Sequence, residues 1–173
     1  RIINAAAGVE DKAGNMFRYE IVNYNRSDNF NGYRHQLQNR LVIDGWKFSN
    51  ILSVTNINAA TLSGSYIRPT IDLSKELSKF KKITIGASYL GEYNKQSIKQ
   101  FDTLSPLSFG FSTWQAYVKS DITRLNKWGI NYFTRKDFYP LGNKLFQADR
   151  SQNINLTTEL LQSENHQLKL NVT

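Results

Sequence analysis

Residues 83–93 have the sequence ITIGASYLGEY, and the alternation in this stretch decides the fold. Successive side chains of a β-strand point to opposite faces, so a strand with one buried face shows a period of two. Ile83, Ile85, Ala87, Tyr89 and Tyr93 take one set of positions, while polar or small residues take most of the other set. The stretch therefore predicts a long strand with one apolar and one polar face.

The same period recurs along the chain. It predicts strands of about eleven residues at 33–43, 46–56, 81–93, 112–123 and 128–138, whereas strands of soluble proteins usually have about five or six residues. Only the stretch 72–80 has apolar residues at helical spacing, and it also fits the end of a strand with a tight connection. We expect an all-β fold, an antiparallel up-and-down meander of about ten long strands.

Turn-forming residues between these strands predict the connections. Asp44-Gly45 is a strong hairpin signal, because a type I′ turn requires positive φ angles. Further short turns are predicted at 11–15, 76–80, 124–127 and 162–165. Longer polar loops are predicted at 25–32, 58–64, 95–110 and 140–151. This order alternates short and long throughout, which would place all long loops at one end of the sheet.

Aromatic residues gather near the predicted strand ends. Phe17, Trp46 and Trp128 follow short turns, and a second group lies near the long loops: Tyr24, Tyr66, Tyr93, Trp114, Phe138 and Tyr139. Amphipathic aromatic rings are enriched at both membrane–water interfaces, and a tilted membrane strand needs roughly nine to eleven residues. We therefore predict a transmembrane β-barrel, or a section of one. A soluble β-sandwich with aromatic residues capping its core is the alternative.

A barrel assigns the two strand faces to two environments. The residues predicted to face lipid or form the aromatic girdle are Phe17, Trp46, Ile85, Tyr93, Trp114, Val118, Trp128, Ile130 and Leu156. Those predicted to face the lumen are Arg34, Arg40, Arg68, Glu92, Lys119, Asp121, Arg135 and Glu159. Opposite charges on neighbouring strands would form cross-strand pairs that line the lumen.

Composition excludes several other classes of function. The chain has no Cys and only two His, so it has no thiolate metal site, and no spacing indicates a zinc site. It has no Gly-x-Ser-x-Gly motif, and its carboxylates are scattered singly. Its net charge of +8 is spread over almost every segment, which argues against a nucleic-acid interface. We predict no enzymatic activity, no cofactor, no metal and no nucleic-acid partner.

Three segments carry a resemblance to a known class of proteins. The segments 32–37 (GYRHQL), 66–75 (YIRPTIDLSK) and 168–173 (LKLNVT) resemble parts of the large outer-membrane β-barrel proteins of Bacteroidota. This resemblance implies transport or protein secretion across the bacterial outer membrane, with membrane lipid and other envelope proteins as partners. The chain departs from that pattern because it has no plug domain and no terminal aromatic residue.

Both chain ends influence the expected organisation. The chain begins at Arg1 without a signal-like apolar stretch, and it stops at 168–173 inside an alternating stretch. We expect residues 1–173 to form a single β-barrel domain or a fragment of a larger barrel. The alternative is a soluble or surface-exposed β-sandwich module that binds a glycan or a protein partner.

Overall fold

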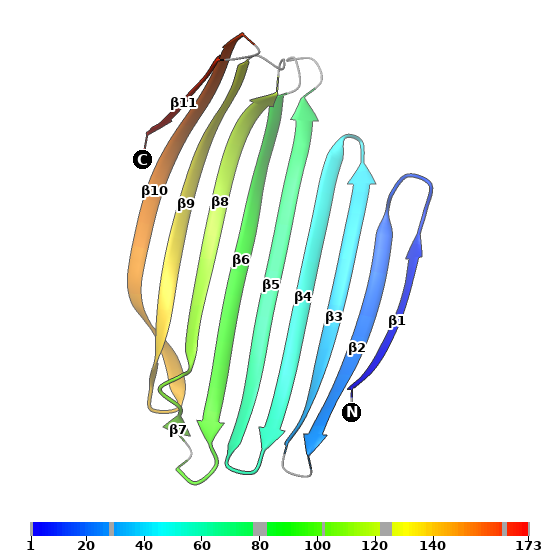
Figure 1. Cartoon of the computed structure of the whole chain (residues 1–173), viewed down its shortest axis with the longest axis vertical. Helices are drawn as coiled ribbons and strands as arrows, with labels where there is room; N and C mark the ends of the chain where they lie inside the picture. The colour runs from blue at the N-terminus through cyan, green and yellow to red at the C-terminus, as the bar shows by residue number, and fades with distance from the viewer. Residues whose placement is uncertain are drawn as a thin grey trace.

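The computed structural model describes residues 2–27, 30–77, 83–101, 103–121, 126–163 and 166–172, and it confirms an antiparallel all-β meander. Ten strands lie side by side in chain order in one sheet, and the short β7 pairs with β6 off this path (Figure 1). The strands are β1 (Ile2–Glu10), β2 (Met16–Ser27), β3 (Phe30–Ile43), β4 (Trp46–Ala59), β5 (Leu62–Leu77), β6 (Ile83–Ile98), β7 (Thr103–Leu104), β8 (Phe109–Asp121), β9 (Asn126–Leu141), β10 (Lys144–Ser163) and β11 (His166–Val172).

The strands are longer than predicted, and the alternation of short and long connections is wrong. Three of the four connections predicted as long loops, at 25–32, 58–64 and 140–151, lie mostly within strands. For example, β4 ends at Ala59 and β5 begins at Leu62. Only the connection between β6 and β8 is long, and it contains β7. The end of the sheet at Asp44–Gly45 is called the turn end. The opposite end, where β7 (Thr103–Leu104) lies, is called the β7 end.

The prediction failed there because periodicity detects the burial of one strand face, not backbone pairing. The segment from Lys144 to Gln152 has polar residues on both faces, and its apolar residues Leu145 and Phe146 are consecutive, so its sequence shows no alternation. Its backbone nevertheless continues the ladder with β9, from Lys144 opposite Leu141 to Gln152 opposite Thr134. Likewise the helix-compatible stretch at 72–80 belongs to β5 as far as Leu77.

The first two predicted short turns are confirmed. Asp44 (φ 49°) and Gly45 (φ 79°) join β3 to β4, and both have the positive φ that a type I′ hairpin requires. At 11–15 the Asp11 carboxylate organises the turn, because its Oδ1 accepts hydrogen bonds from the Ala13 and Asn15 backbone N–H groups at 2.8 and 2.9 Å. The turns predicted at 76–80, 124–127 and 162–165 lie partly outside the described residues.

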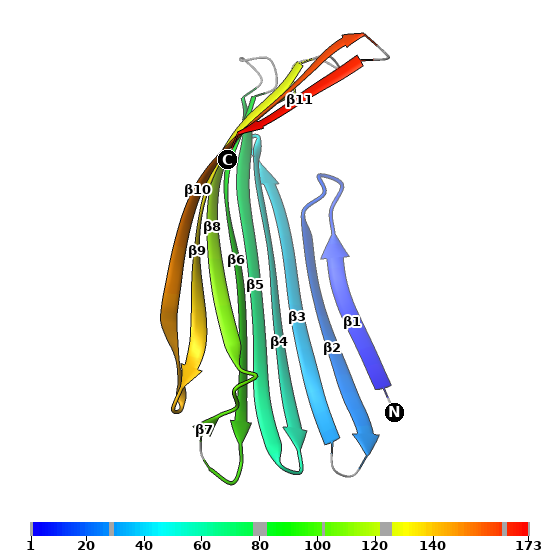
Figure 2. The ribbon, with the colours of Figure 1, turned by 60° about the vertical axis from the view of Figure 1, so that its left-hand side comes forward.

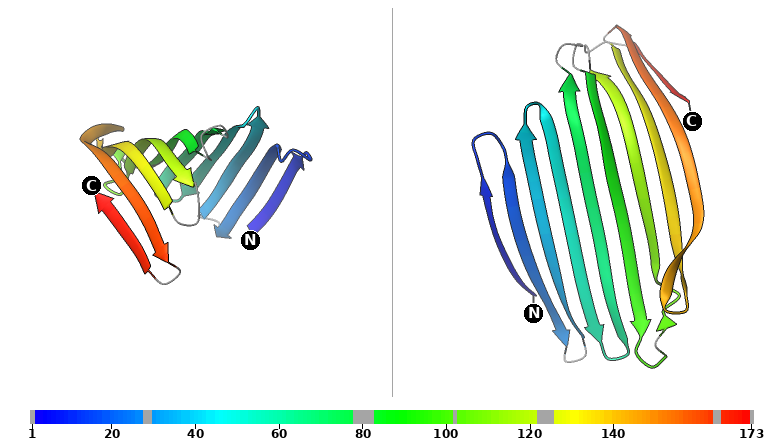
Figure 3. Two further views of the ribbon diagram at one scale, coloured as in Figure 1. Left: turned by 90° about the horizontal axis from the view of Figure 1, so that it is seen from above. Right: turned by 180° about the vertical axis from the view of Figure 1, so that it is seen from behind.

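The sheet is twisted and curved, and its two outermost strands are not paired with each other. Figure 2 shows β10 and β11 curling over at one end, and Figure 3 shows β1 and β11 at opposite edges of an open arc. Within the described residues, β1 and β11 each have a strand on one side only. The sheet therefore has two free edges.

Successive strands are displaced along one another. A row of directly paired residues starts at Glu10, the last residue of β1, and reaches β10 at Asn153 through Met16, Arg40, Ser49, Asp72, Ser88, Gln115 and Phe133. Asn153 lies about ten residues before the last residue of β10, Ser163. This displacement of about ten residues, at about 3.3 Å per residue, accumulates over the steps from β1 to β10, which are about 4.8 Å each. If the hairpin turns mark the rim of a barrel, the strands are inclined by about 40° to the barrel axis.

The Asp44–Gly45 turn gives a test of this hairpin. We expect Gly45→Ala to lower the free energy of unfolding by about 1 kcal/mol, because a Cβ disfavours positive φ. Asp44→Asn should leave the stability nearly unchanged, because Asn tolerates the left-handed region. Urea titration of the folded protein in detergent micelles measures both. An equal loss in the two variants would contradict the turn geometry.

The Asp11 turn gives a pH-dependent test. The Asn15 side chain donates a hydrogen bond to Asp11 Oδ2 at 2.8 Å, and this bond, with bonds from nearby backbone N–H groups, lowers the pKa of the Asp11 carboxyl. A lowered pKa means that the turn is stabilised above the ordinary carboxyl pKa and loses this stabilisation as pH falls through the folded pKa. We expect Asn15→Ala to raise the pKa of Asp11 in an NMR titration, whereas Lys12→Ala leaves it nearly unchanged.

Candidate functional site

The candidate functional site is the sheet itself, because strand register separates its residues into two faces. Ile85, Val118, Ile130 and Leu156 lie directly opposite one another on four successive strands. The same register places every residue predicted to face lipid on this face, called the apolar face: Phe17, Trp46, Ile85, Tyr93, Trp114, Val118, Trp128, Ile130 and Leu156.

The opposite face, called the polar face, carries every residue predicted to face the lumen. These are Arg34, Arg40, Arg68, Glu92, Lys119, Asp121, Arg135 and Glu159. The side chains of Asp121 and Glu159 lie outside the described residues, so these two are placed by backbone register alone. Which face meets lipid and which meets a lumen stays a prediction.

The apolar face is open to its surroundings over its whole width. Val9, Ile43, Trp114 and Ile154 have relative exposures of 73%, 61%, 56% and 62%. Among the described residues, only one large apolar side chain, Val22, is buried, and it lies on the polar face. The described sheet therefore has no hydrophobic core of its own.

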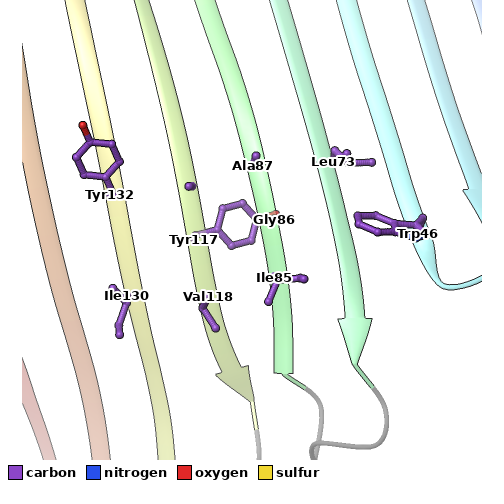
Figure 4. A pocket seen from close by; sticks show the side chains of 10 residues that line it. Trp46, Leu73, Ile85, Gly86, Ala87, Tyr117, Val118, Ile130 and Tyr132 are labelled. Carbon is purple, nitrogen blue, oxygen red and sulfur yellow. The ribbon is translucent and has the colours of Figure 1, made fainter.

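A shallow hollow of about 450 Å³ marks the apolar face towards the turn end (Figure 4). Ala87 and Ala116 lie directly opposite each other at its centre, and their small side chains leave the space open. Trp46, Ile85 and Tyr132 are among the residues around it. The lining is almost entirely apolar, so the hollow suits a hydrocarbon chain.

The aromatic residues near the predicted long loops do not form one row. Tyr93, Trp114 and Phe138 lie on the apolar face, whereas register places Tyr24 and Tyr66 on the polar face. On the apolar face the rings contact one another: Trp114 lies 4.7 Å from Tyr89 and Phe138 lies 5.9 Å from Tyr93, between ring centroids. Proximity to a strand end predicted these positions, but parity along the strand decides the face.

Charged side chains on the polar face pair across strands. Arg34 lies 3.1 Å from Glu20 on the neighbouring strand, and Arg18 approaches the same carboxylate at 3.8 Å. Arg68 lies 2.9 Å from Glu92 and also donates a hydrogen bond to the Tyr66 hydroxyl. The side chains of Glu20 and Glu92 are only 13% and 16% exposed, so their charges depend on these arginines.

A second polar network lies nearer the turn end. The Tyr117 hydroxyl donates a hydrogen bond to Asp72 Oδ2 at 3.2 Å, across the intervening β6. Gly86 makes this reach feasible, because a Cβ at this position would overlap the Tyr117 ring. An aromatic side chain over a strand glycine replaces the packing that the glycine lacks. Arg135 and Asp137 form a further ion pair at 2.8 Å.

A hollow of about 590 Å³ lies on the polar face towards the β7 end. Its lining combines two arginines with aromatic and hydroxyl groups: Tyr24, Phe30, Gly32, Arg34, Gln36, Ile51, Ser53, Thr55, Ile57, Tyr66, Arg68 and Thr70. Both arginines are already paired with carboxylates, which lowers the net charge of the hollow. Most of the remaining lining is apolar, so the hollow combines two paired arginines with a largely apolar wall.

The described residues offer no cluster of side chains for metal binding. Within them, no group of three His, Asp or Glu side chains is placed to hold a metal ion. The His35 Nδ1 atom lies 2.6 Å from the Tyr19 hydroxyl, on the apolar face, so this imidazole is already hydrogen-bonded. The side chain of His166 lies outside the described residues.

Sequence reasoning missed the contacts that depend on register. The reach of Tyr117 over Gly86 to Asp72 involves three strands, and the placement of Arg18 and Arg34 around Glu20 involves two. Alternation gives the parity of each strand, but it does not say which residues stand opposite each other. The signal available was the hairpin turn at Asp44–Gly45, which fixes one register directly.

The Glu20 network gives a test of the polar face. We expect a double-mutant cycle of Glu20→Gln and Arg34→Gln to give a coupling energy of about 1 kcal/mol in unfolding titrations. The matched control is the ion pair of Glu10 and Arg40. Their charged groups are 2.6 Å apart, and their side chains are 56% and 48% exposed. This control should show a smaller coupling, because solvent screens it. Equal couplings would contradict the inferred shielding of Glu20.

Comparison with known proteins adds no relative to this geometry. No family model, no curated protein and no solved structure matches the chain. Among the described residues, no helix is long and apolar enough to cross a membrane. The structure thus establishes the all-β antiparallel fold, and function is argued from the two faces of the sheet.

Proposed function

We propose that the chain forms a section of a β-barrel wall in a bacterial outer membrane, with the apolar face towards lipid and the polar face towards a lumen. Its role is to support transport or secretion of a solute or polypeptide, without bond-making chemistry. One observation carries this proposal, namely the apolar face that extends over the sheet with no layer of described residues covering it.

The solvent-accessible surface area of the chain shows how much of the sheet is left uncovered. The chain exposes 12200 Å², whereas a compact monomer of its mass exposes about 8,700 Å². The excess supports a cover over this face rather than a bare monomer in water, because the exposed surface includes a continuous band of Ile, Leu, Val and aromatic side chains. Hydrocarbon of a bilayer would cover this band without a second protein layer.

The dimensions of the apolar band favour lipid as that cover. On β6 the band runs from Ile83 to Tyr93, about 33 Å along the strand. At an inclination of about 40° this corresponds to a height of about 25 Å, the height of the lipid-facing band of outer-membrane barrels. The inclination itself lies within the range of about 35–45° found for such strands.

The polar face supports a water-filled passage. Ion pairs and hydrogen bonds satisfy many of its charged groups, and the hollow between Arg34 and Arg68 leaves room for a polar cargo. The free edges of β1 and β11 support a closed wall, because unpaired backbone groups are very costly inside a bilayer. These edges would pair with each other or with further strands.

The second candidate is a soluble β-sandwich module that binds a glycan or a protein partner. Its apolar face would have to be buried against a second sheet about 10 Å away. The described residues form one sheet only, so another chain or segment would have to supply that layer. Clean monomeric behaviour without detergent would favour the sandwich.

Spin-label scanning along residues 83–93 tests the proposal. In vesicles, oxygen should reach labels at residues 85, 87 and 89 better than a water-soluble nickel complex, and the preference should reverse at 84 and 88. Labels at 118, 130 and 156 should match residue 85, because they lie in one row. The physical reason is that oxygen concentrates in hydrocarbon while the nickel complex stays in water.

A label at Asn143 is the control, because this position lies in the β9–β10 turn and should meet water. Absence of the two-residue period along 83–93 would overturn the proposal. A period accompanied by low accessibility to both reagents on the apolar face would instead indicate burial against protein, and would favour the sandwich.

A further inference from the structure

The apolar face changes character on β8, β9 and β10 towards the β7 end. Five polar residues that share this face lie in two adjacent cross-strand rows, and they are called the cationic patch: Ser112, Thr134, Lys136, Arg150 and Gln152. Lys136 lies directly opposite both Ser112 and Arg150, and Thr134 lies directly opposite Gln152. Polar residues also occupy this face on β3 to β6, in the row of Asn31, Asn58, Ser63 and Ser97, but that row carries no charge.

Among the described side chains, none supplies a compensating charge to the two cations of the patch. Directly opposite like charges on a sheet destabilise it, and Lys136 and Arg150 form such a pair. Within the described residues, neither has a carboxylate within ion-pair distance, whereas Arg34, Arg68 and Arg135 on the polar face each do. The nearest acidic residues along the chain, Asp137 and Asp149, lie on the polar face.

A second observation points to a missing partner at the same place. The Thr134 hydroxyl oxygen is buried but has no hydrogen-bond partner in the described structure. Buried polar groups are usually paired, and this hydroxyl is one of six buried side-chain atoms without a partner among the described residues. One anionic group placed between Lys136 and Arg150 would neutralise both cations.

The position of the patch along the strands identifies the source of that anion. Trp114 is in the row of Thr134, which is the row of the patch nearer the turn end. Phe138 is in the next row of this face beyond Lys136, towards the β7 end. Aromatic residues of this kind mark the level of lipid headgroups. We propose that the cationic patch binds the phosphate of an anionic lipid in the leaflet at the β7 end. This inference rests on the proposed membrane location of the sheet.

The donor chemistry of the patch fits a phosphate. Arg150 offers a planar guanidinium that can bind two phosphate oxygens, and Lys136 offers an ammonium point charge. The exposed Gln152 adds a neutral donor. Long Lys and Arg side chains also keep their charged ends at the interface while their stems lie along apolar surface, so the site requires no charge in the hydrocarbon.

Quenching of Trp114 fluorescence by brominated lipids tests the inference, because Trp114 borders the patch and is 56% exposed. The full chain would carry Trp46→Phe and Trp128→Phe, leaving Trp114 as its only Trp. Vesicles of phosphatidylcholine would contain a minor fraction of either brominated phosphatidic acid or brominated phosphatidylcholine. We expect phosphatidic acid to be enriched beside Trp114 about fivefold or more.

The variant Lys136→Gln with Arg150→Gln should abolish this enrichment. The matched control, Lys47→Gln with Lys119→Gln, removes the same charge from the polar face and should retain it. Equal quenching by the two lipids in the parent protein, or persistent enrichment in the patch variant, would overturn the patch but leave the barrel proposal intact. Absence of quenching by either lipid would overturn both.

Discussion

Backbone hydrogen bonding between neighbouring strands is the constraint on which this structure depends. In an ordinary domain, a core joins elements from several layers, but here the described residues form one layer with no core. Each strand is held mainly by the strands beside it, so cohesion comes from the ladder and from side-chain pairs across it. Long strands follow from this, because each additional residue adds backbone pairing without requiring another layer.

The ladder also determines where charge can be placed. On the polar face, register brings Arg34 to Glu20 and Arg68 to Glu92, so charged groups compensate one another within the sheet. On the apolar face, Lys136 and Arg150 face each other without such compensation. The contrast arises from the same register acting on two sets of residues. A face that must stay apolar near its centre tolerates cations only near its margins.

The sequence predicted the strand faces well and the connections poorly. Alternation in stretches such as 83–93 assigns residues to faces strand by strand, and Asp44–Gly45 identifies one turn, since both signals are local. The extensions of β4, β5, β9 and β10 were missed because these segments have no alternation of apolar and polar residues. The pairs Glu20–Arg34 and Lys136–Arg150 were also missed, since each depends on a register between strands.

The displacement of about one residue per strand has a consequence for assembly. In a closed cylinder, inclination is determined by the ratio of total displacement to strand number, so it does not change when hairpins are added at a constant displacement. Circumference would then grow with each hairpin while the height of the hydrocarbon-facing zone stayed the same. A wall built on this plan is modular, since one repeating geometry serves narrow and wide rings in a membrane of fixed thickness.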